Sequence, residues 1–175
     1  MNLILVGGES AGLQALKAIL RTSHQLVAVL AAPSQSGFAG ASVTGLANKL
    51  GVPVWPAARV RDPELGAVIR DASVDLILNV HSLYLVHPEV LHAPRIGCFN
   101  LHPGSLPGYA GLNSPSWAIY NGERSHGVTL HWMMKGIDVG PIAFQERFPI
   151  EDADTGLSLA LKCVRAGIPL IEELN

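Results

Sequence analysis

The sequence has few charged residues, few cysteines and no long hydrophobic run. Charged side chains make up 15% of the 175 residues and hydrophobic ones 49%, so the chain can bury enough apolar surface to fold rather than stay disordered. The longest apolar run, Leu26–Pro33, is far shorter than the roughly 20 residues that a membrane-spanning helix needs. The first residues, Met1–Ile4, lack the basic segment of a secretory signal. We therefore expect a cytoplasmic protein with no membrane partner.

Neither the cysteines nor the charge balance indicates a metal centre or a nucleic-acid partner. Cys98 and Cys163 lie in apolar stretches without Cys-x-x-Cys or Cys/His spacing, so we interpret them as reduced core residues. With 12 Lys and Arg against 14 Asp and Glu and a pI of 6.4, the chain lacks the positive charge typical of nucleic-acid-binding domains. The mean hydropathy of +0.31 instead indicates strands buried on both faces, as in parallel sheets.

The order of apolar and amphipathic segments predicts the fold class. Apolar runs near 2–6, 26–31, 52–55, 74–80 and 96–101 alternate with helical patterns, which is typical of βαβ units. Segments 127–133 and 142–150 have period-two alternation and predict a half-exposed antiparallel pair. A last helix should begin at Thr155 and be interrupted by Gly167 and Pro169. We predict an α/β fold, a doubly wound, Rossmann-like and mainly parallel sheet with an appended antiparallel hairpin. We expect one catalytic domain over 1–175, taken from a longer protein.

A glycine turn after the first strand invites comparison with dinucleotide-binding proteins. Gly7 and Gly12 match two of the three glycines of that fingerprint, but Glu9 stands at the middle position, where its carboxylate would face phosphates. The acid expected about 20 residues further on is missing as well. The pattern excludes NAD and leaves a tight strand-to-helix turn or a contact to a polar substrate.

The candidate catalytic side chains follow the fifth expected strand. Asn100 and His102 are two residues apart and therefore point the same way from a strand. Open α/β sheets bind ligands outside the carboxyl ends of their strands. An amide and an imidazole on one face can donate hydrogen bonds to a developing oxyanion. The alternative to a catalytic role is that these residues are polar only because the end of the strand is exposed to solvent.

A third candidate is Asp138, in the segment 136–141 between the two antiparallel strands. An aspartate in a glycine turn is commonly a turn former, but beside a protonated histidine it raises the imidazole pKa and orients the ring. A metal site of His81, His102 and Asp138 is conceivable by composition, but no local ligand spacing supports it, so we predict no metal. The other histidines are scattered: His24, His87, His92, His126 and His131.

Four motifs together resemble the N10-formyltetrahydrofolate-dependent formyltransferases. The match is dense over 97–141 and mostly topological over the first 95 residues. The motifs are Asn100-x-His102, Leu106-Pro107-x-Tyr109-x-Gly111, His126-Gly127-Val128-Thr129 and Gly136-Ile137-Asp138-x-Gly140-Pro141.

The resemblance implies a catalytic trio of Asn100, His102 and Asp138. In it, Asn100 and a protonated His102 stabilise the oxyanion, while Asp138 keeps His102 charged and orders a proton-shuttling water. It also implies N10-formyltetrahydrofolate as co-substrate, no metal, and a folate pocket formed by the segment 82–86 and the loop 135–138. The residues assigned to folate are Tyr84, Leu85, Val86, Lys135, Gly136, Ile137 and Asp138.

Departures from the family pattern reduce the number of acceptors that we expect. The family often has serine where this chain has Gly104, and the loop at 33–40 contains no cation. Segments 111–118 and 155–159 resemble formyltransferase domains associated with nonribosomal peptide synthetases. We therefore expect formyl transfer to a primary amine, either an aminoacyl group on a carrier domain or a free small amine, and not to tRNA. The alternatives are methionyl-tRNA formyltransferase, phosphoribosylglycinamide formyltransferase, and a folate-binding module without enzymatic activity.

Overall fold

The structure, a computed structural model, describes residues 1–31 and 42–174. Within these residues a seven-stranded sheet has the order β3-β2-β1-β4-β5-β6-β7. The predicted α/β class, a mainly parallel sheet with an antiparallel end, is confirmed. The chain divides into two compact units, Met1–Phe99 and Asn100–Asn175. One catalytic domain over 1–175 stays a prediction, and the predicted cation-free loop at 33–40 lies outside the described residues.

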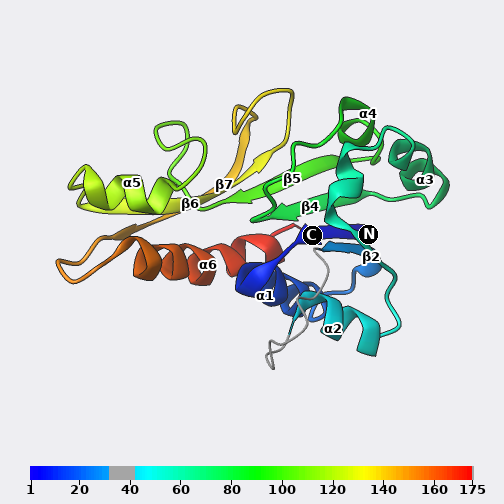
Figure 1. Cartoon of the computed structure of the whole chain (residues 1–175), viewed down its shortest axis with the longest axis horizontal. Coiled ribbons are helices and arrows are strands. Elements are labelled where there is room, and N and C mark those ends of the chain that lie inside the picture. Colours follow the sequence, from blue (N-terminus) through cyan, green and yellow to red (C-terminus); the bar gives the residue numbers. More distant parts are fainter. Residues whose placement is uncertain (32–41, 175) are drawn as a thin grey trace. The chain divides into compact units, whose positions relative to one another are not determined.

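The first unit contains parallel strands with helices on both faces. β1 (Asn2–Gly7) pairs with β2 (Gln25–Ala31) and with β4 (Leu76–Val80), and β2 pairs with β3 (Val54–Pro56), all in parallel. β1 and β4 are buried almost throughout, as expected of strands covered on both faces. The helices are α1 (Glu9–Ile19), α2 (Val43–Lys49), the 3-10 helix η1 (Ala57–Arg61), α3 (Leu65–Asp71) and α4 (Pro88–Leu91). α1 and α2 lie on one side of these strands, and α3 and α4 lie on the other (Figure 1).

Close packing accounts for the glycine turn between β1 and α1. A Cβ atom added to Gly12 would lie 2.9 Å from the carbonyl carbon of Gly7, and one added to Gly7 would lie 3.2 Å from Val80 O. Only glycines allow the turn to pack this tightly. The turn therefore has a structural reason that requires no ligand.

The second unit begins within β5 (Gly97–His102) and continues into an antiparallel pair and two helices. β6 (Ser125–Trp132) and β7 (Ile142–Pro149) pair antiparallel from Ser125↔Pro149 to His131↔Ile142. α6 (Gly156–Glu172) packs against both strands and against α5 (Ser114–Tyr120) (Figure 1). A capping box begins α6, in which Thr155 and Ser158 exchange side-chain to backbone hydrogen bonds.

Two details of the sequence prediction were wrong in this unit. α6 continues through Gly167 and Pro169 to Glu172. Pro169 removes one backbone N–H donor from the helix but does not end it. Gly167 serves packing instead, since a Cβ atom there would lie 2.9 Å from Leu101 Cδ2. β6 is not half-exposed but buried on both faces, and its polar side chains Thr129 and His131 are 0% and 2% exposed.

The cysteine prediction is confirmed: Cys98 and Cys163 are free, buried thiols. Burial raises the pKa of each thiol to about 12, so both stay protonated at neutral pH. Among the described helices, none combines the length and hydropathy needed to cross a membrane.

Candidate active site

Two polar side chains stand at the end of β5. Asn100 is half-buried, and the His102 side chain is only 5% exposed. Apolar neighbours on the same strand, Phe99 and Leu101, are buried in the core. Burial of the strand holds the amide and the imidazole at fixed positions.

The loop between β6 and β7 supplies Asp138 in a strained backbone conformation. Its φ is +51°, in the left-handed region that non-glycine residues rarely adopt. Gly140 closes the loop against β6, since an added Cβ would overlap Trp132 O. Such strain persists only where surrounding contacts hold the residue, and it is common at functional sites.

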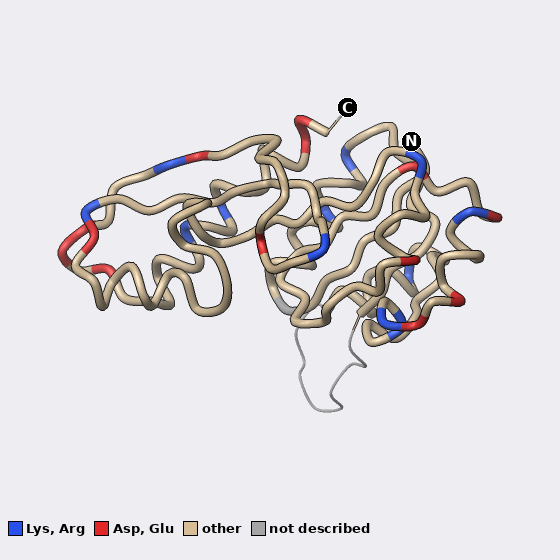
Figure 2. Tube along the Cα trace, turned by 90° about the horizontal axis from the view of Figure 1, so that it is seen from above, with Lys and Arg blue, Asp and Glu red and all other residues tan. Residues whose placement is uncertain are grey.

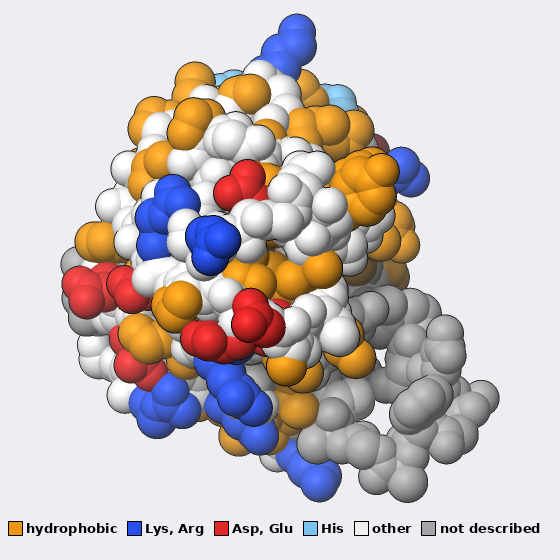
Figure 3. All heavy atoms as spheres, turned by 90° about the vertical axis from the view of Figure 1, so that its left-hand side faces the viewer, with side chains coloured by type: hydrophobic (Ala, Val, Ile, Leu, Met, Phe, Trp, Pro, Cys, Tyr) orange, Lys and Arg blue, Asp and Glu red, His pale blue; other side chains and the backbone are white. Residues whose placement is uncertain are grey.

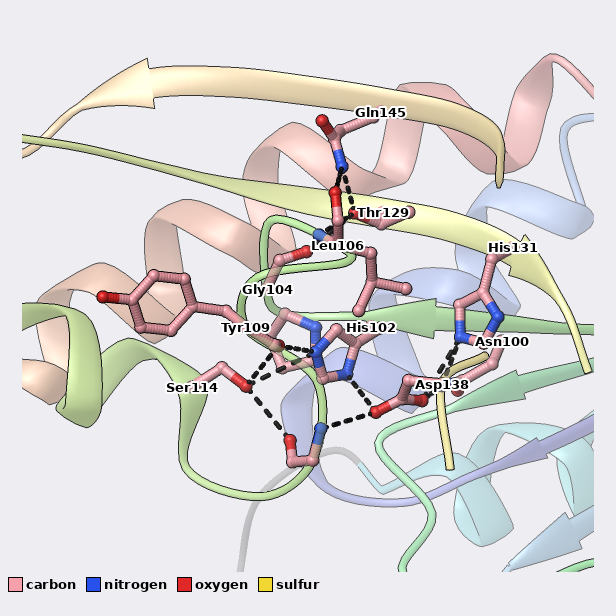
Figure 4. Close-up of polar contacts among 12 residues, drawn as sticks. Asn100, His102, Gly104, Leu106, Tyr109, Ser114, Thr129, His131, Asp138 and Gln145 are labelled. Atoms are coloured by element: carbon pink, nitrogen blue, oxygen red, sulfur yellow. Dashed lines mark hydrogen bonds and ion pairs between the residues drawn. The ribbon is translucent and has the colours of Figure 1, made fainter. Parts of the chain in front are cut away.

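Asp138 brings the predicted trio together (Figure 4). Its Oδ2 lies 3.3 Å from His102 Nδ1, and its Oδ1 accepts a hydrogen bond from Asn100 Nδ2 at 3.2 Å. Asn100, His102 and Asp138 therefore form one polar cluster, and the carboxylate lies at its centre. The Asn100 amide already donates to Asp138, rather than being free for an oxyanion alone.

A fourth side chain, His131, belongs to this cluster and was missed by sequence reasoning. Its Nε2 lies 3.3 Å from Asp138 Oδ1 and 3.3 Å from Asn100 Nδ2, and its Nδ1 lies 2.8 Å from Trp132 O. His131 lies near the end of β6, and the loop that follows this strand carries Asp138. Because alternate residues of a strand share a face, this position could have indicated that His131 belongs near Asp138. The prediction that β6 is half-exposed hid this possibility.

Backbone groups of the segment 103–113 complete the cluster. Tyr109 O accepts a hydrogen bond from His102 Nε2 at 2.6 Å, and Gly111 N donates to Asp138 Oδ2 at 2.9 Å. The Ser114 hydroxyl lies 3.0 Å from Tyr109 O and 3.4 Å from His102 Nε2. Both ring nitrogens of His102 therefore face oxygen atoms.

A buried hydroxyl fastens the start of this segment to β6. Thr129 Oγ1 donates to Gly104 O at 2.7 Å and accepts from Leu106 N at 3.3 Å and from Gln145 Nε2 at 2.8 Å. Gln145 Nε2 also donates to Leu106 O at 3.1 Å (Figure 4). The hydroxyl has one donor and two acceptor sites, and all three are in use.

The protonation state of His102 differs from the sequence expectation. Burial lowers its pKa below the ordinary value of 6.5; the Tyr109 carbonyl and the Asp138 carboxylate raise it but do not compensate, and His131 adds to the lowering. A pKa below 6.5 favours the neutral imidazole in the resting protein at pH 7. Asp138 raises this pKa, as expected, but not by enough to hold the resting ring charged. The physical reason is that desolvation of a nearly buried ring outweighs one carboxylate at 3.3 Å.

Asp138 itself is firmly ionised. Burial acts to raise its pKa, but the hydrogen bonds from His131 and Gly111, together with electrostatic attraction to the His102 and His131 rings, lower it to about 2. An ionised carboxylate beside His102 stabilises the imidazolium form of that ring.

The hydrogen bonds of His102 indicate which of its two nitrogens carries the proton of the neutral ring. A neutral imidazole has one N–H, and the short 2.6 Å contact to Tyr109 O requires it on Nε2. Nδ1 then carries the lone pair, 3.3 Å from Asp138 Oδ2. A proton gained at Nδ1 converts this contact into a charge-assisted hydrogen bond.

The residues predicted to bind folate lie in two loops, one in each unit. In the first unit, Tyr84 is half-buried beneath the Arg61 guanidinium, 5.4 Å from its ring centroid, and Leu85 is 68% exposed. In the second unit, Lys135, Gly136 and Ile137 are exposed beside half-buried Asp138. Each loop offers apolar surface and backbone groups to a flat, polar-edged ring, and their role stays a prediction.

Over residues 1–31 and 42–174, no group of three or more His, Cys, Asp or Glu side chains is arranged to hold a metal ion. The alternative site of His81, His102 and Asp138 therefore gains no support. The first of these, His81, has a positive φ of 53° at the end of β4.

The fold and the cluster together define an α/β protein with an Asn–His–Asp polar centre at a strand end. Residues 2–168 match the formyl transferase family, and the chain belongs to that family.

Individual relatives agree with this assignment. The chain is 34% identical, over 99% of its length and 56% of the relative's, to methionyl-tRNA formyltransferase of Synechococcus sp. (strain JA-3-3Ab). A crystal structure of phosphoribosylglycinamide formyltransferase from Bacillus halodurans has the same fold, with a TM-score of 0.83 and 23% identity over 99% of this chain and 95% of that one. An N-formyltransferase from Helicobacter canadensis, solved with folinic acid and dTDP-3-aminofucose, has a TM-score of 0.76 and 23% identity over 98% of this chain and 61% of that one. The chain spans about half the length of the curated relative it matches.

Proposed function

We propose that the protein transfers a formyl group from N10-formyltetrahydrofolate to a primary amine. The observation that carries this proposal is the buried Asp138 carboxylate, which contacts Asn100, His102 and His131 in a chain of the formyl transferase family. The co-substrate supplies the formyl group, and the protein's residues handle the proton and the developing negative charge.

His102 acts as the proton carrier in the proposed reaction. As the amine nitrogen forms its bond to the formyl carbon, Nδ1 of the neutral ring takes the amine proton. The resulting imidazolium is stabilised by Asp138 and by Tyr109 O. The same proton then passes to the departing nitrogen of the co-substrate as its bond to the formyl carbon breaks, so the ring returns to its starting state.

The Asn100 amide donates to the oxyanion that forms between these two proton transfers. The imidazolium stabilises the oxyanion through its positive charge, because its two N–H groups face Asp138 and Tyr109 O. An amide donor aimed at a developing oxyanion is typically worth about 10²–10³ in rate. Asp138 holds both groups, because its two oxygens contact the Asn100 amide and the His102 ring. Its low pKa keeps it ionised throughout.

The folate assignment comes from the resemblance and is tested in each loop separately. Leu83, Leu85, Ile137 and Val139 are each more than half exposed, which suits contact with an apolar ring system. We expect Leu85→Ala and Ile137→Ala each to raise the KM for N10-formyltetrahydrofolate, with smaller effects on kcat. An unchanged KM in either variant would remove that loop from the folate site.

The main test is turnover with N10-formyltetrahydrofolate and a panel of primary amines. Asn100→Ala and His102→Ala should each lose about 10²–10³ in kcat. The exposed residues Asn48 and His92 provide matched controls, and Asn48→Ala and His92→Ala should stay close to the original rate. Near-normal turnover in either site variant would refute the assigned roles, and no turnover with any amine would favour the folate-binding module.

A chelator should leave the rate unchanged, whereas loss of activity together with a stoichiometric metal would indicate a metal-dependent hydrolase.

For the acceptor we propose a free small amine or an aminoacyl group on a carrier domain. Lys and Arg are interspersed with Asp and Glu along the described chain, and the surface in Figure 3 carries both signs beside hydrophobic side chains (Figures 2 and 3). Such an acceptor needs only a short approach to His102 and no extended cationic surface. Two of the proteins described above are named for tRNA and for phosphoribosylglycinamide, and the third was solved with dTDP-3-aminofucose. None of the three is named for a peptide synthetase.

Formylation of an aminoacyl-tRNA is the second candidate, favoured by the relative at 34% identity. A competition experiment distinguishes the two proposed acceptors. Charged initiator tRNA competes with an aminoacyl-carrier domain or with small amines, at low and at physiological salt. Phosphate contacts make nucleic-acid binding weaken steeply with salt. Efficient tRNA formylation with a steep salt dependence would replace the first acceptor and leave the transfer chemistry intact.

A further inference from the structure

Tyr109 contacts the catalytic cluster with its backbone and a separate part of the unit with its side chain. Its carbonyl oxygen accepts the 2.6 Å hydrogen bond from His102 Nε2. Its hydroxyl donates to Glu123 Oε1 at 2.7 Å and accepts from Asn121 Nδ2 at 3.2 Å. One residue therefore links the proton-carrying imidazole to the turn that follows α5.

The carbonyl determines how the His102 ring works. Because it requires the N–H on Nε2, it leaves Nδ1 as the nitrogen that gains and loses a proton beside Asp138. It also fixes the ring plane, since a 2.6 Å hydrogen bond tolerates little rotation. Movement of this carbonyl would change both the tautomer and the direction of Nδ1.

The backbone around Tyr109 lies partly at the surface, where Tyr109 N donates to Ser105 O at 3.0 Å and the Ser114 hydroxyl donates to Tyr109 O at 3.0 Å. The Tyr109 side chain adds a further restraint to these two. Pro107, Gly108 and Ala110 are exposed, and Gly111 adopts a positive φ of 89°. Glycines next to exposed backbone leave a segment easily displaced. The Tyr109 ring restrains it by packing edge-on against buried His126, with the centroids 5.5 Å apart.

The hydroxyl partners lie on the exposed turn that follows α5. Asn121 caps α5, Gly122 has a positive φ of 67°, and Glu123 N donates to Ala118 O. These are features of a helix end closed by a left-handed glycine. The backbone of this turn is closed by hydrogen bonds, and the Glu123 and Asn121 side chains give the Tyr109 hydroxyl an attachment point outside the catalytic cluster.

We propose that Tyr109 is a positioning residue for the transfer reaction, whose side chain, anchored by Glu123 and Asn121, holds its carbonyl against His102 Nε2. The inference rests on the proposed function for its catalytic consequence, but the restraint on His102 can be measured without any substrate.

The test compares Tyr109→Phe, which removes the hydroxyl and keeps the ring, with Tyr120→Phe, an exposed tyrosine on α5. The readout is titration of the His102 imidazole, followed through its nitrogen signals by NMR in the ligand-free protein. The charged or titratable groups that act on this ring are Asp138 and His131, with His126 on the adjoining strand. The Tyr109 carbonyl raises the His102 pKa, so a loosened carbonyl should lower the titration midpoint by about half a pH unit or more.

Kinetics give a second readout. With the best amine of the panel, Tyr109→Phe should lower kcat by about fivefold to tenfold and leave the KM for N10-formyltetrahydrofolate unchanged. Glu123→Gln keeps an acceptor oxygen and should retain the original midpoint and rate, whereas Glu123→Ala should resemble Tyr109→Phe. Comparison of these two variants shows whether the Tyr109 hydroxyl needs a hydrogen-bond acceptor at this position or the negative charge of Glu123.

Thermal unfolding of each variant shows whether it is folded before the comparison is made. If Tyr109→Phe does not fold, the two Glu123 variants carry the test. A His102 midpoint that is the same in the original protein, Tyr109→Phe and Glu123→Ala would overturn the proposal. A shifted midpoint without turnover in the original protein would support the positioning role and refute formyl transfer.

Discussion

Burial and hydrogen bonding determine different properties of His102. Its neutral resting state comes from desolvation, while its tautomer and orientation come from Tyr109 O and Asp138. A ring that is neutral at rest suits a base that collects the amine proton. A ring that is charged at rest would suit only oxyanion stabilisation, and the two roles predict opposite pH dependences.

We therefore expect kcat/KM to rise with pH between 5 and 7, with an apparent pKa below the ordinary histidine value of 6.5. The acceptor should have a pKa below about 5, so that its own protonation does not enter the profile. Asp138→Asn removes a group that raises the His102 pKa, so the profile should move to lower pH while kcat falls by about 10² or more. A rate that falls with rising pH over this range would mean that charged His102 is the active form.

Sequence reasoning identified part of this residue-scale picture. Strand periodicity placed Asn100 and His102 on one face, and a glycine-bounded aspartate suggested Asp138. It did not identify His131, or Tyr109 as a partner of His102, because their contacts depend on strand burial and on a backbone carbonyl. Any residue can supply a carbonyl, so the side-chain pattern carries no signal for it.

At the scale of elements, the segment 103–113 is held closely against His102. A Cβ atom added to Gly104 would lie 2.5 Å from both His102 Nε2 and Tyr109 O. Thr129 simultaneously holds the Gly104 carbonyl from β6. The polar positions of β6, which the period-two pattern assigned to solvent, are buried because they bind this segment and Asp138.

Gly104→Ala should therefore displace the segment or the ring and lower kcat by about tenfold or more. Gly108→Ala is the matched control in the same segment, since its added Cβ would meet only Ser105 O, at an ordinary 3.7 Å. Turnover and thermal unfolding of both variants provide the measurement. Equal activity in the two would show that the close approach of Gly104 to His102 has no bearing on the reaction.

At the scale of the whole molecule, the shifted pKa values of the ionisable groups predict that acid lowers the stability of the folded protein. Burial lowers the pKa of His102 and His126 from 6.5, so the unfolded chain binds more protons than the folded one as pH falls below about 6.5. Asp138 and Asp154 have pKa values lowered from 3.8 to about 2, the latter chiefly by its hydrogen bond from Lys162. Their stabilisation is complete above the unfolded pKa and is lost as pH falls from about 4 to 2.

The free energy of unfolding, from urea titrations, should therefore fall from pH 7 to 5 and again below about pH 4. Each proton of difference contributes a slope of at most about 1.4 kcal/mol per pH unit. His102→Gln should flatten the first step, whereas His92→Gln, at an exposed position, should not. A protein that is more stable at pH 5 than at pH 7 would contradict these pKa directions.

The sequence alone determined the α/β class, the strand and helix order, the free buried cysteines and the family, because these follow from local hydrophobic periodicity and from motifs of contiguous residues. Only the tertiary structure decided that His102 is neutral at rest, that β6 is buried on both faces, and that α6 continues through Pro169. It also decided that His131 and the Tyr109 carbonyl contact the polar cluster of Asn100, His102 and Asp138. The physical reason is that desolvation and hydrogen bonding depend on what surrounds a group in space, and residues far apart in the chain supply those surroundings.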